Sequence, residues 1–217
     1  HAGSGVVDAM VKVGIAGGSG YGGAELIHIL LRHPEVEISW VSSQQHTGKN
    51  PADVYPNLRG FLNLTYSALE SLPVSSLDVL FLALPHGQAM SLVPGLPKNL
   101  VVVDLSGDFR INDPVVFEEF YGLPLTALEE QKHFVYGLTE INRDSIRSAL
   151  RVANPGCFAT ATILALYPLF EEDWIAGPVF VDAKTGSSGA GNSPVAGTHH
   201  PRRANSLFPY KPFRHQH

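Results

Sequence analysis

The residue most able to take part in a chemical reaction is Cys157, the single cysteine of the chain. It follows Asn154-Pro155-Gly156, which can continue neither a strand nor a helix, because proline lacks an N–H donor and glycine is conformationally free. The apolar run 159–166 after it has helical spacing. We therefore expect the thiol at or next to a helix N-terminus, where unpaired N–H groups and the helix dipole favour the thiolate. A buried, inert cysteine is the alternative, because free cysteines are among the most buried residues.

A glycine-rich turn, Gly17–Gly23, is the second candidate functional feature. Its glycines at 17, 20 and 23 stand between the apolar run Val11–Ala16 and the run Ala24–Arg32, whose apolar residues have helical spacing. A strand, a glycine turn and a helix in this order bring backbone N–H groups up to a pyrophosphate. We therefore predict dinucleotide binding, with a plain turn as the alternative.

The choice of dinucleotide depends on the end of the next apolar run, Val36–Val41. An NAD site has a carboxylate there that binds the ribose 2′-hydroxyl, whereas this chain has Ser42 and Ser43. Small hydroxyls suit a 2′-phosphate better, and Lys49 and His46 are the nearest partners for one. The sequence therefore favours NADP over NAD.

A charged segment, Asp104–Arg110, follows another predicted strand, at the edge of the sheet where ligands bind in open α/β folds. Arg110 could pair bidentately with an anionic substrate group. A surface ion pair with Asp108 or Asp113 is the alternative. Farther along, Tyr136–Glu140 either closes over the site or forms a turn before a capped helix.

Small residues and histidines are concentrated towards the end of the chain. The loop Lys184–Gly191 would let the backbone approach a flat ring such as nicotinamide, with a flexible loop as the alternative. The histidines at 199, 200, 215 and 217 predict no metal site, because one cysteine and no nearby carboxylate accompany them. A histidine that acts as the base for the thiol is better motivated.

Further apolar runs predict the elements that must position these residues. Strands are expected at 77–84, 100–105 and 151–153, helices at 88–93, 117–121, 126–131 and 159–169, and a β-rich segment at 178–184. Strands alternating with helices predict an α/β fold with a Rossmann-type, doubly wound parallel sheet. We interpret residues 1–10 as a tag or disordered leader, residues 11–156 as the dinucleotide-binding domain, and residues 157–217 as the start of a second domain.

Composition excludes several classes of protein. The net charge of −5 and the pI near 6.0 give no basic footprint for a nucleic acid. No apolar run reaches the roughly 18 residues of a membrane span. A single cysteine excludes an intrachain disulfide and fits a reducing compartment such as the cytoplasm.

Together these motifs resemble one family, the N-acetyl-γ-glutamyl-phosphate reductases of arginine biosynthesis. The resemblance rests on motifs in family order: the Gly17–Gly23 turn, Leu84-Pro85-His86-Gly87, Leu105–Arg110, Asn154–Cys157 and Gly186–Gly191. The sequence is also similar to the reductases of lysine biosynthesis. Aspartate-semialdehyde dehydrogenase is a related family, from which the second and third motifs differ.

The resemblance implies an oxidoreductase in which Cys157 attacks an acyl phosphate, phosphate leaves, and NADPH reduces the resulting thioester to a semialdehyde. It also implies an α+β catalytic and dimerisation domain, here incomplete, and a homo-oligomer (dimer or tetramer). The implied catalytic residues are Cys157, His215 as the base and Asn154. The implied cofactor contacts are Gly17, Ser19, Gly20, Tyr21, Gly23, Ser42, Ser43, Pro85, His86, Ser188 and Gly189, and the implied substrate contacts are Arg110, Ser106, Glu140 and His217.

Alternatives to this function stay open. Residues 199–203 and 210–212 look closer to the lysine branch, whose substrate is an amino-group-blocked aminoadipyl phosphate in place of N-acetyl-glutamyl 5-phosphate. The same catalyst could run in the oxidising direction. A non-catalytic, dinucleotide-binding redox sensor has the same glycine turn. Because family chains continue past this point, we expect the natural chain to extend beyond His217.

Overall fold

The computed structural model describes residues 9–210 and shows a parallel α/β fold. Its strands belong to one sheet, in the order β2-β1-β3-β4-β6-β5. The pairs β1–β2, β1–β3 and β5–β6 are parallel, which confirms the predicted Rossmann-type sheet. The strands are β1 (Val11–Ala16), β2 (Val36–Val41), β3 (Val79–Leu82), β4 (Val101–Asp104), β5 (Val135–Tyr136) and β6 (Arg151–Ala153).

The helices occupy the segments between and after these strands. Two predicted helices are longer than expected: the one predicted at 159–169 begins at Cys157, and the one at 117–121 begins at Pro114. The α-helices are α1 (Tyr21–Leu30), α2 (Pro51–Val54), α3 (Gln88–Leu92), α4 (Pro114–Tyr121), α5 (Leu128–Gln131), α6 (Thr139–Ser148), α7 (Cys157–Glu171) and α8 (His200–Arg203).

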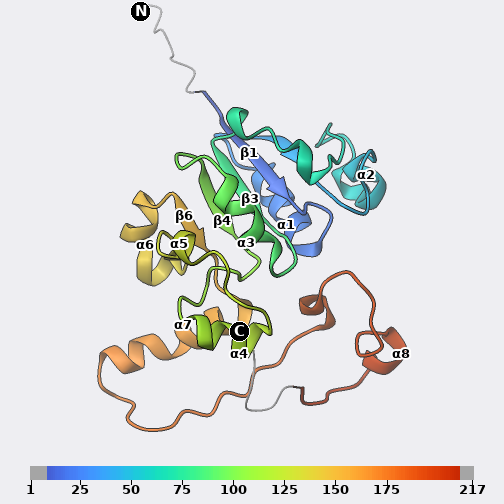
Figure 1. The fold of residues 1–217 in the computed structure, drawn as a ribbon. Coiled ribbons are helices and arrows are strands. Elements are labelled where there is room, and N and C mark those ends of the chain that lie inside the picture. The colour runs from blue at the N-terminus through green and yellow to red at the C-terminus, as the bar shows by residue number, and fades with distance from the viewer. Residues whose placement is uncertain (1–8, 211–217) are drawn as a thin grey trace, which may run out of the picture. The chain divides into compact units, whose positions relative to one another are not determined.

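The chain forms two compact units, residues 1–84 with 95–103 and residues 85–94 with 104–217. In the first unit β1 lies between β2 and β3, so the order in which successive strands are added to the sheet reverses beside β1. Figure 1 shows α1 alongside β1, and buried side chains of β1, β2 and α1 form one core with Leu58 and Tyr66. This core fixes the start of α1, and with it the glycine turn at the edge where nucleotides bind in such sheets.

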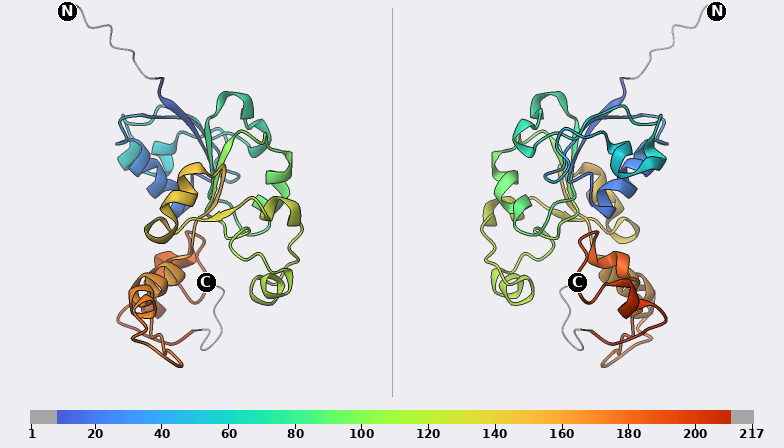
Figure 2. Two further views of the ribbon diagram at one scale, coloured as in Figure 1. Left: turned by 90° about the vertical axis from the view of Figure 1, so that its left-hand side faces the viewer. Right: turned by 90° about the vertical axis from the view of Figure 1, so that its right-hand side faces the viewer.

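The second unit contains the segments that follow β3, β4 and β6. Gly156 precedes the first turn of α7 in an extended conformation, so the turn before Cys157 ends where the helix begins. Figure 2 shows the chain after α7 on a long, mostly irregular path that includes α8. Between residues 9 and 210, no helix is long and apolar enough to cross a membrane.

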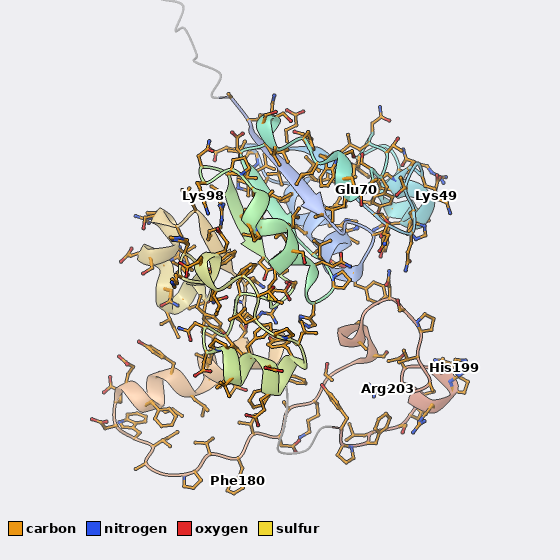
Figure 3. The ribbon with its side chains drawn as sticks, in the orientation of Figure 1. Lys49, Glu70, Lys98, Phe180, His199 and Arg203 are labelled. Atoms are coloured by element: carbon orange, nitrogen blue, oxygen red, sulfur yellow. The ribbon has the colours of Figure 1, made fainter. Side chains whose placement is uncertain are left out.

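The β-rich segment predicted at 178–184 is wrong for the described structure, because these residues form no strand. Phe180 is 91% exposed and points away from the ribbon in Figure 3. A β-strand needs a hydrogen-bonded neighbour, and none lies beside this segment in the described part of the chain. The predicted domain boundary at residue 156 does not correspond to the boundary between the two compact units, and it stays a prediction.

Candidate active site

The glycine turn after β1 has no room for side chains at two of its positions. Gly17 has a φ of +84°, and a Cβ there would overlap the carbonyl oxygen of Ala83. A Cβ on Gly23 would overlap the carbonyl oxygen of Gly17. Gly20, which has no side chain for capping, is the N-cap of α1. The first N–H groups of this helix are therefore available to an anion, which fits the pyrophosphate of a dinucleotide.

Hydroxyl groups hold this turn in place from outside. The Gly17 N–H donates to Ser42 Oγ at 3.2 Å, and the Gly18 N–H donates to the Ser42 carbonyl at 2.8 Å. The Oγ atoms of Ser19 and Ser43 lie 2.7 Å apart. The predicted cofactor residues Ser42 and Ser43 are thus brought to the glycine turn, where their side chains shape it; their contact with a nucleotide stays a prediction.

Two tyrosines also form hydrogen bonds with the glycine turn, and the sequence alone did not indicate them. We call these serine and tyrosine hydroxyls the neutral brace of the turn. The Tyr55 hydroxyl donates to the Ser19 carbonyl at 2.9 Å, and the Tyr66 hydroxyl donates to the Gly18 carbonyl at 3.3 Å. Tyr66 is 1% exposed, and burial, followed by the neighbouring Tyr55, raises its pKa to about 12. A neutral hydroxyl at this position satisfies a carbonyl without placing charge near the phosphate site.

The loop after β4 holds two buried aspartates in opposite electrostatic environments. Asp104 Oδ1 accepts from the N–H of Ser106 at 2.9 Å and from its hydroxyl at 2.6 Å. Burial raises the pKa of Asp104 despite these bonds. Burial also acts to raise the pKa of Asp108, but contacts with His86 and the N–H groups of Gly87 and Met90 outweigh it and lower that pKa. The fold therefore stabilises the anion of Asp108 and disfavours that of Asp104.

Arg110 connects this loop to the turn before the cysteine. Its Nε donates to the Asn154 carbonyl at 2.7 Å, and its Nη2 donates to the Leu105 carbonyl at 2.8 Å. The Asn154 N–H in turn donates to the Asp104 carbonyl at 2.8 Å. The structure thus brings the predicted residues Arg110 and Asn154 together, and the guanidinium is held by carbonyl oxygens instead of the predicted alternative, an ion pair with an aspartate.

Cys157 occupies the first position of α7 and is exposed, so the alternative of a buried thiol is wrong, and the reactivity of the thiol stays a prediction. Tyr210 lies close to it: burial, followed by the charge of Cys157, raises the pKa of Tyr210. The Phe158 and Tyr210 rings lie 6.5 Å apart. The thiol is therefore exposed at a helix N-terminus, where a substrate could reach it.

A hollow of about 650 Å³ lies beside Arg110 in the second unit. The rings of Phe109 and Phe134 stack at 3.9 Å along it, and Tyr136 and Lys132 line it with Arg110. Apolar ring faces and a cation in one hollow suit an organic anion.

The remaining predicted residues are more scattered. Ser106 lies at the Asp104 carboxylate, and His86 lies 3.6 Å from Asp108. Ser188 and Gly189 form a short 3-10 helix, and Glu140 is exposed in the first turn of α6. His215 and His217 lie outside the described residues. Within residues 9–210, no group of His, Cys, Asp and Glu is placed to hold a metal ion.

Comparison with known proteins gives the family of the chain. Residues 12–149 match the family "Semialdehyde dehydrogenase, NAD binding domain", and residues 157–217 match "Semialdehyde dehydrogenase, dimerisation domain". An aspartate semialdehyde dehydrogenase II from Vibrio cholerae has a similar fold, with a TM-score of 0.53 at 16% identity over 75% of this chain and 43% of that chain.

Among curated relatives, an "N-acetyl-gamma-glutamyl-phosphate reductase" from Methanopyrus kandleri is 47% identical over 96% of this chain and 62% of its own length. A "[LysW]-L-2-aminoadipate 6-phosphate reductase" from Deinococcus radiodurans is 44% identical over 94% of this chain and 59% of its own length. The chain thus spans about three fifths of the length of the curated relatives it matches.

Proposed function

The chain belongs to the semialdehyde dehydrogenase family, and we propose that it carries the cofactor site and the nucleophile of an NADPH-dependent acyl-phosphate reductase. One observation supports this most strongly: Cys157 is exposed at the first position of a 15-residue helix, directly after the turn whose carbonyl group binds Arg110. A nucleophile and a cation for phosphate are thereby attached to the same turn.

The reaction divides into two steps at Cys157. In the first, the thiolate sulfur bonds to the acyl carbon, and the bond from that carbon to the phosphate oxygen breaks, so inorganic phosphate leaves and a thioester remains. In the second, the carbon–sulfur bond breaks as the carbon is reduced, which releases the semialdehyde and restores the thiolate. Bound NADPH supplies the hydride for this reduction.

The residues of the first unit fit a dinucleotide. The closely packed Gly17 and Gly23 let the backbone approach a pyrophosphate, and the uncapped start of α1 supplies N–H groups. Ser42 and Ser43 follow β2 without a carboxylate, which supports NADP over NAD. The other proposed cofactor contacts are Ser19, Gly20, Tyr21, Pro85, His86, Ser188 and Gly189.

The proposed substrate site uses donors around the thiol. The Cys157 N–H and the Asn154 side chain stabilise the oxyanion that forms during attack, and Arg110 with Ser106 binds the phosphoryl group. Glu140 and His217 complete the contacts, and His215 is the proposed base for the thiol. We place Cys157 and the two histidines in a second domain that begins at residue 157, and we propose a cytoplasmic homo-oligomer (dimer or tetramer).

Two acyl phosphates are candidate substrates, because the relatives have names of both kinds. We favour N-acetyl-glutamyl 5-phosphate over an amino-group-blocked aminoadipyl phosphate, since the relative with the higher identity of these two has the corresponding name. Oxidation of NADPH with each compound, side by side in the full protein, gives the ratio of kcat/KM values. A higher value for the aminoadipyl compound would reverse this choice.

The thiol chemistry is tested with Cys157→Ser. Serine preserves the size of the side chain but is a far weaker nucleophile at neutral pH, so we expect kcat to fall by about 10³-fold or more. The affinity for NADPH, measured by fluorescence titration, stays within about twofold, which serves as the control for folding. Reductase activity that survives in Cys157→Ser would refute the proposed mechanism.

A further inference from the structure

Three polar side chains converge on the backbone of Gly107 in the loop after β4. Gly107 has a φ of +101°, and a Cβ there would lie 3.0 Å from Arg110 Nη1, 3.0 Å from His86 Cε1 and 3.1 Å from the Tyr121 hydroxyl. These groups come from segments on either side of α3 and from the end of α4. Their closeness makes a small polar cluster that includes two side chains able to carry positive charge.

A buried carboxylate fixes His86 in this cluster. Asp108 is 0% exposed, and its two oxygens accept from the Gly87 N–H at 2.8 and 2.9 Å and from the Met90 N–H at 3.1 Å. His86 Nδ1 lies 3.6 Å from Asp108 Oδ1, an ion-pair distance. Asp108 thus holds the main chain on both sides of the start of α3 and faces the imidazole that precedes it.

The imidazole and the guanidinium both border the backbone of Gly107. Nδ1 of His86 faces Asp108, and Cε1, the ring carbon between the two nitrogens, faces Gly107. The Tyr121 ring lies 4.8 Å from the imidazole at 60° and restricts its rotation. Arg110 uses Nε and Nη2 for the carbonyls of Asn154 and Leu105 and also forms a hydrogen bond with the Tyr121 side chain, while Nη1 lies on the side of Gly107 and His86.

We propose that His86 is a second phosphate-binding residue beside Arg110, and that Asp108 is the residue that positions it. This rests on the proposed function, and it assigns to His86 a role on the substrate in place of a cofactor contact. The groups that face His86 are the Asp108 carboxylate, the Arg110 guanidinium and the Tyr121 hydroxyl. The imidazole held by this carboxylate and the Arg110 guanidinium then offer two donors to one phosphoryl group.

Two donors at the phosphoryl group affect both binding and the first chemical step. An acyl phosphate brings about two negative charges, which one guanidinium already attached to two carbonyls only partly balances. As the carbon–oxygen bond breaks, further charge gathers on the oxygen that leaves with phosphate. A second donor therefore strengthens substrate binding and binding of the product, inorganic phosphate.

The test compares His86→Gln and Asp108→Asn with Asp113→Asn in the full protein. Asp113 is a matched control, because its carboxylate also accepts main-chain N–H bonds, from Val115 and Val116, but has no histidine beside it. We expect the KM for the acyl phosphate and the Ki of inorganic phosphate to rise about tenfold in the first two variants, with the KM for NADPH within about twofold. The control changes none of the three.

Two outcomes overturn the assignment. In one, His86→Gln raises the KM for NADPH and leaves the Ki of phosphate unchanged, which returns His86 to the cofactor. In the other, Asp108→Asn raises both KM values equally, which reduces Asp108 to a structural role. Should Asp108→Asn not fold, the His86→Gln result decides the phosphate assignment by itself.

A second measurement separates this proposal from the proposed function. Inorganic phosphate is titrated into the protein while the ¹³Cε1 signal of His86, identified by its loss in His86→Gln, is followed by NMR. A phosphate-dependent shift that Arg110→Ala weakens supports the shared anion site even if no reductase activity is found. A signal that does not move with phosphate refutes the site, whatever the enzyme does.

Discussion

Two segments at the carboxyl ends of strands, Gly17–Gly23 after β1 and Asp104–Arg110 at the end of β4, would each hold an anion in the proposed function, and they are built in different ways. The first contains no charged residue and is braced by neutral hydroxyls of serine and tyrosine. The second contains two buried aspartates and an arginine. A loop that offers main-chain N–H groups is held without charge, because a nearby carboxylate would compete with the ligand. A loop that offers cationic side chains needs carboxylates and carbonyls to orient them.

The charged loop further divides the work between its two aspartates. Asp104 is bonded to Ser106 of its own loop, and in the described structure its Oδ2 has no hydrogen-bond partner. Asp108 instead reaches a segment 21 residues earlier in the chain, at Gly87. The first shapes its loop locally, and the second connects two loops. The pKa of Asp108 is lowered because His86 and the N–H groups of Gly87 and Met90 outweigh its burial, whereas burial outweighs the Ser106 bonds at Asp104.

The largest expected effect breaks the neutral loop at Gly17. Gly17→Ala forces a Cβ onto the Ala83 carbonyl at a φ that only glycine adopts freely, so the turn must move. We expect the free energy of unfolding to fall by about 2 kcal/mol or more and the affinity for NADPH to drop at least about tenfold. Chemical denaturation and fluorescence titration measure the two effects.

Gly22→Ala is the matched control for this substitution. Gly22 lies in α1, and a Cβ there would meet nothing within 4 Å. Alanine favours a helix over glycine, so stability should be unchanged or higher by up to about 1 kcal/mol. Equal NADPH affinity in Gly17→Ala and Gly22→Ala would show that the close backbone approach at Gly17 is unnecessary for binding.

The second prediction sharpens the contrast within the charged loop through pH. The folded pKa of Asp108 is lowered, so its stabilisation is fully present above about pH 4, its unfolded value, and is lost as pH falls through the folded value. The folded pKa of Asp104 is raised, so this residue costs stability as pH rises above about 4 towards the folded value. The two carboxylates thus act in opposite directions.

Urea denaturation of Asp108→Asn and Asp104→Asn between pH 3 and pH 7 checks these signs. Asp108→Asn should be less stable than the parent by about 2 kcal/mol at pH 6, and the difference should shrink towards pH 3. Asp104→Asn should gain stability relative to the parent as pH rises. Parallel pH profiles for the two variants would contradict the opposite pKa shifts.

Local patterns in the sequence predicted the parts of the molecule that depend on neighbouring residues. The bounds of β1 and β2, the glycine turn and the helix that starts at the cysteine all follow from hydrophobic spacing and turn residues. The strand predicted at 178–184 was wrong because its β-branched and aromatic residues, Val179–Val181, favour a strand, whereas a strand forms only beside a partner. Apolar patterning indicates which secondary structure a segment prefers, but not which segment will lie beside it.

The contacts that orient the site were hidden because their partners are far apart in the sequence. Tyr66 reaches Gly18 across 48 residues, and Arg110 reaches Asn154 across 44. Neither contact has a local motif, since a tyrosine or an arginine in a loop has many possible partners. For Arg110 and Asn154 the signal that could have pointed to the contact is topological: both follow strands of the same sheet, β4 and β6, at whose carboxyl ends loops distant in sequence meet.

The smallest expected effect removes one hydroxyl from the neutral loop. Tyr66→Phe leaves the Gly18 carbonyl without its donor, so we expect a loss of about 1 kcal/mol in stability and a rise of a few-fold in the Kd of NADPH. Because the pKa of Tyr66 is raised to about 12, the contribution of its hydroxyl to the free energy of unfolding falls between pH 10 and pH 12 in the parent protein. The phenylalanine variant has no such loss. The advantage of the parent should therefore shrink over that range, whereas Tyr167→Phe, at an exposed site on α7, should follow the parent at every pH. An advantage that stays constant to pH 12 would mean that the hydroxyl is hydrated in the fold, and the neutral brace would then rest on Tyr55 and the serines.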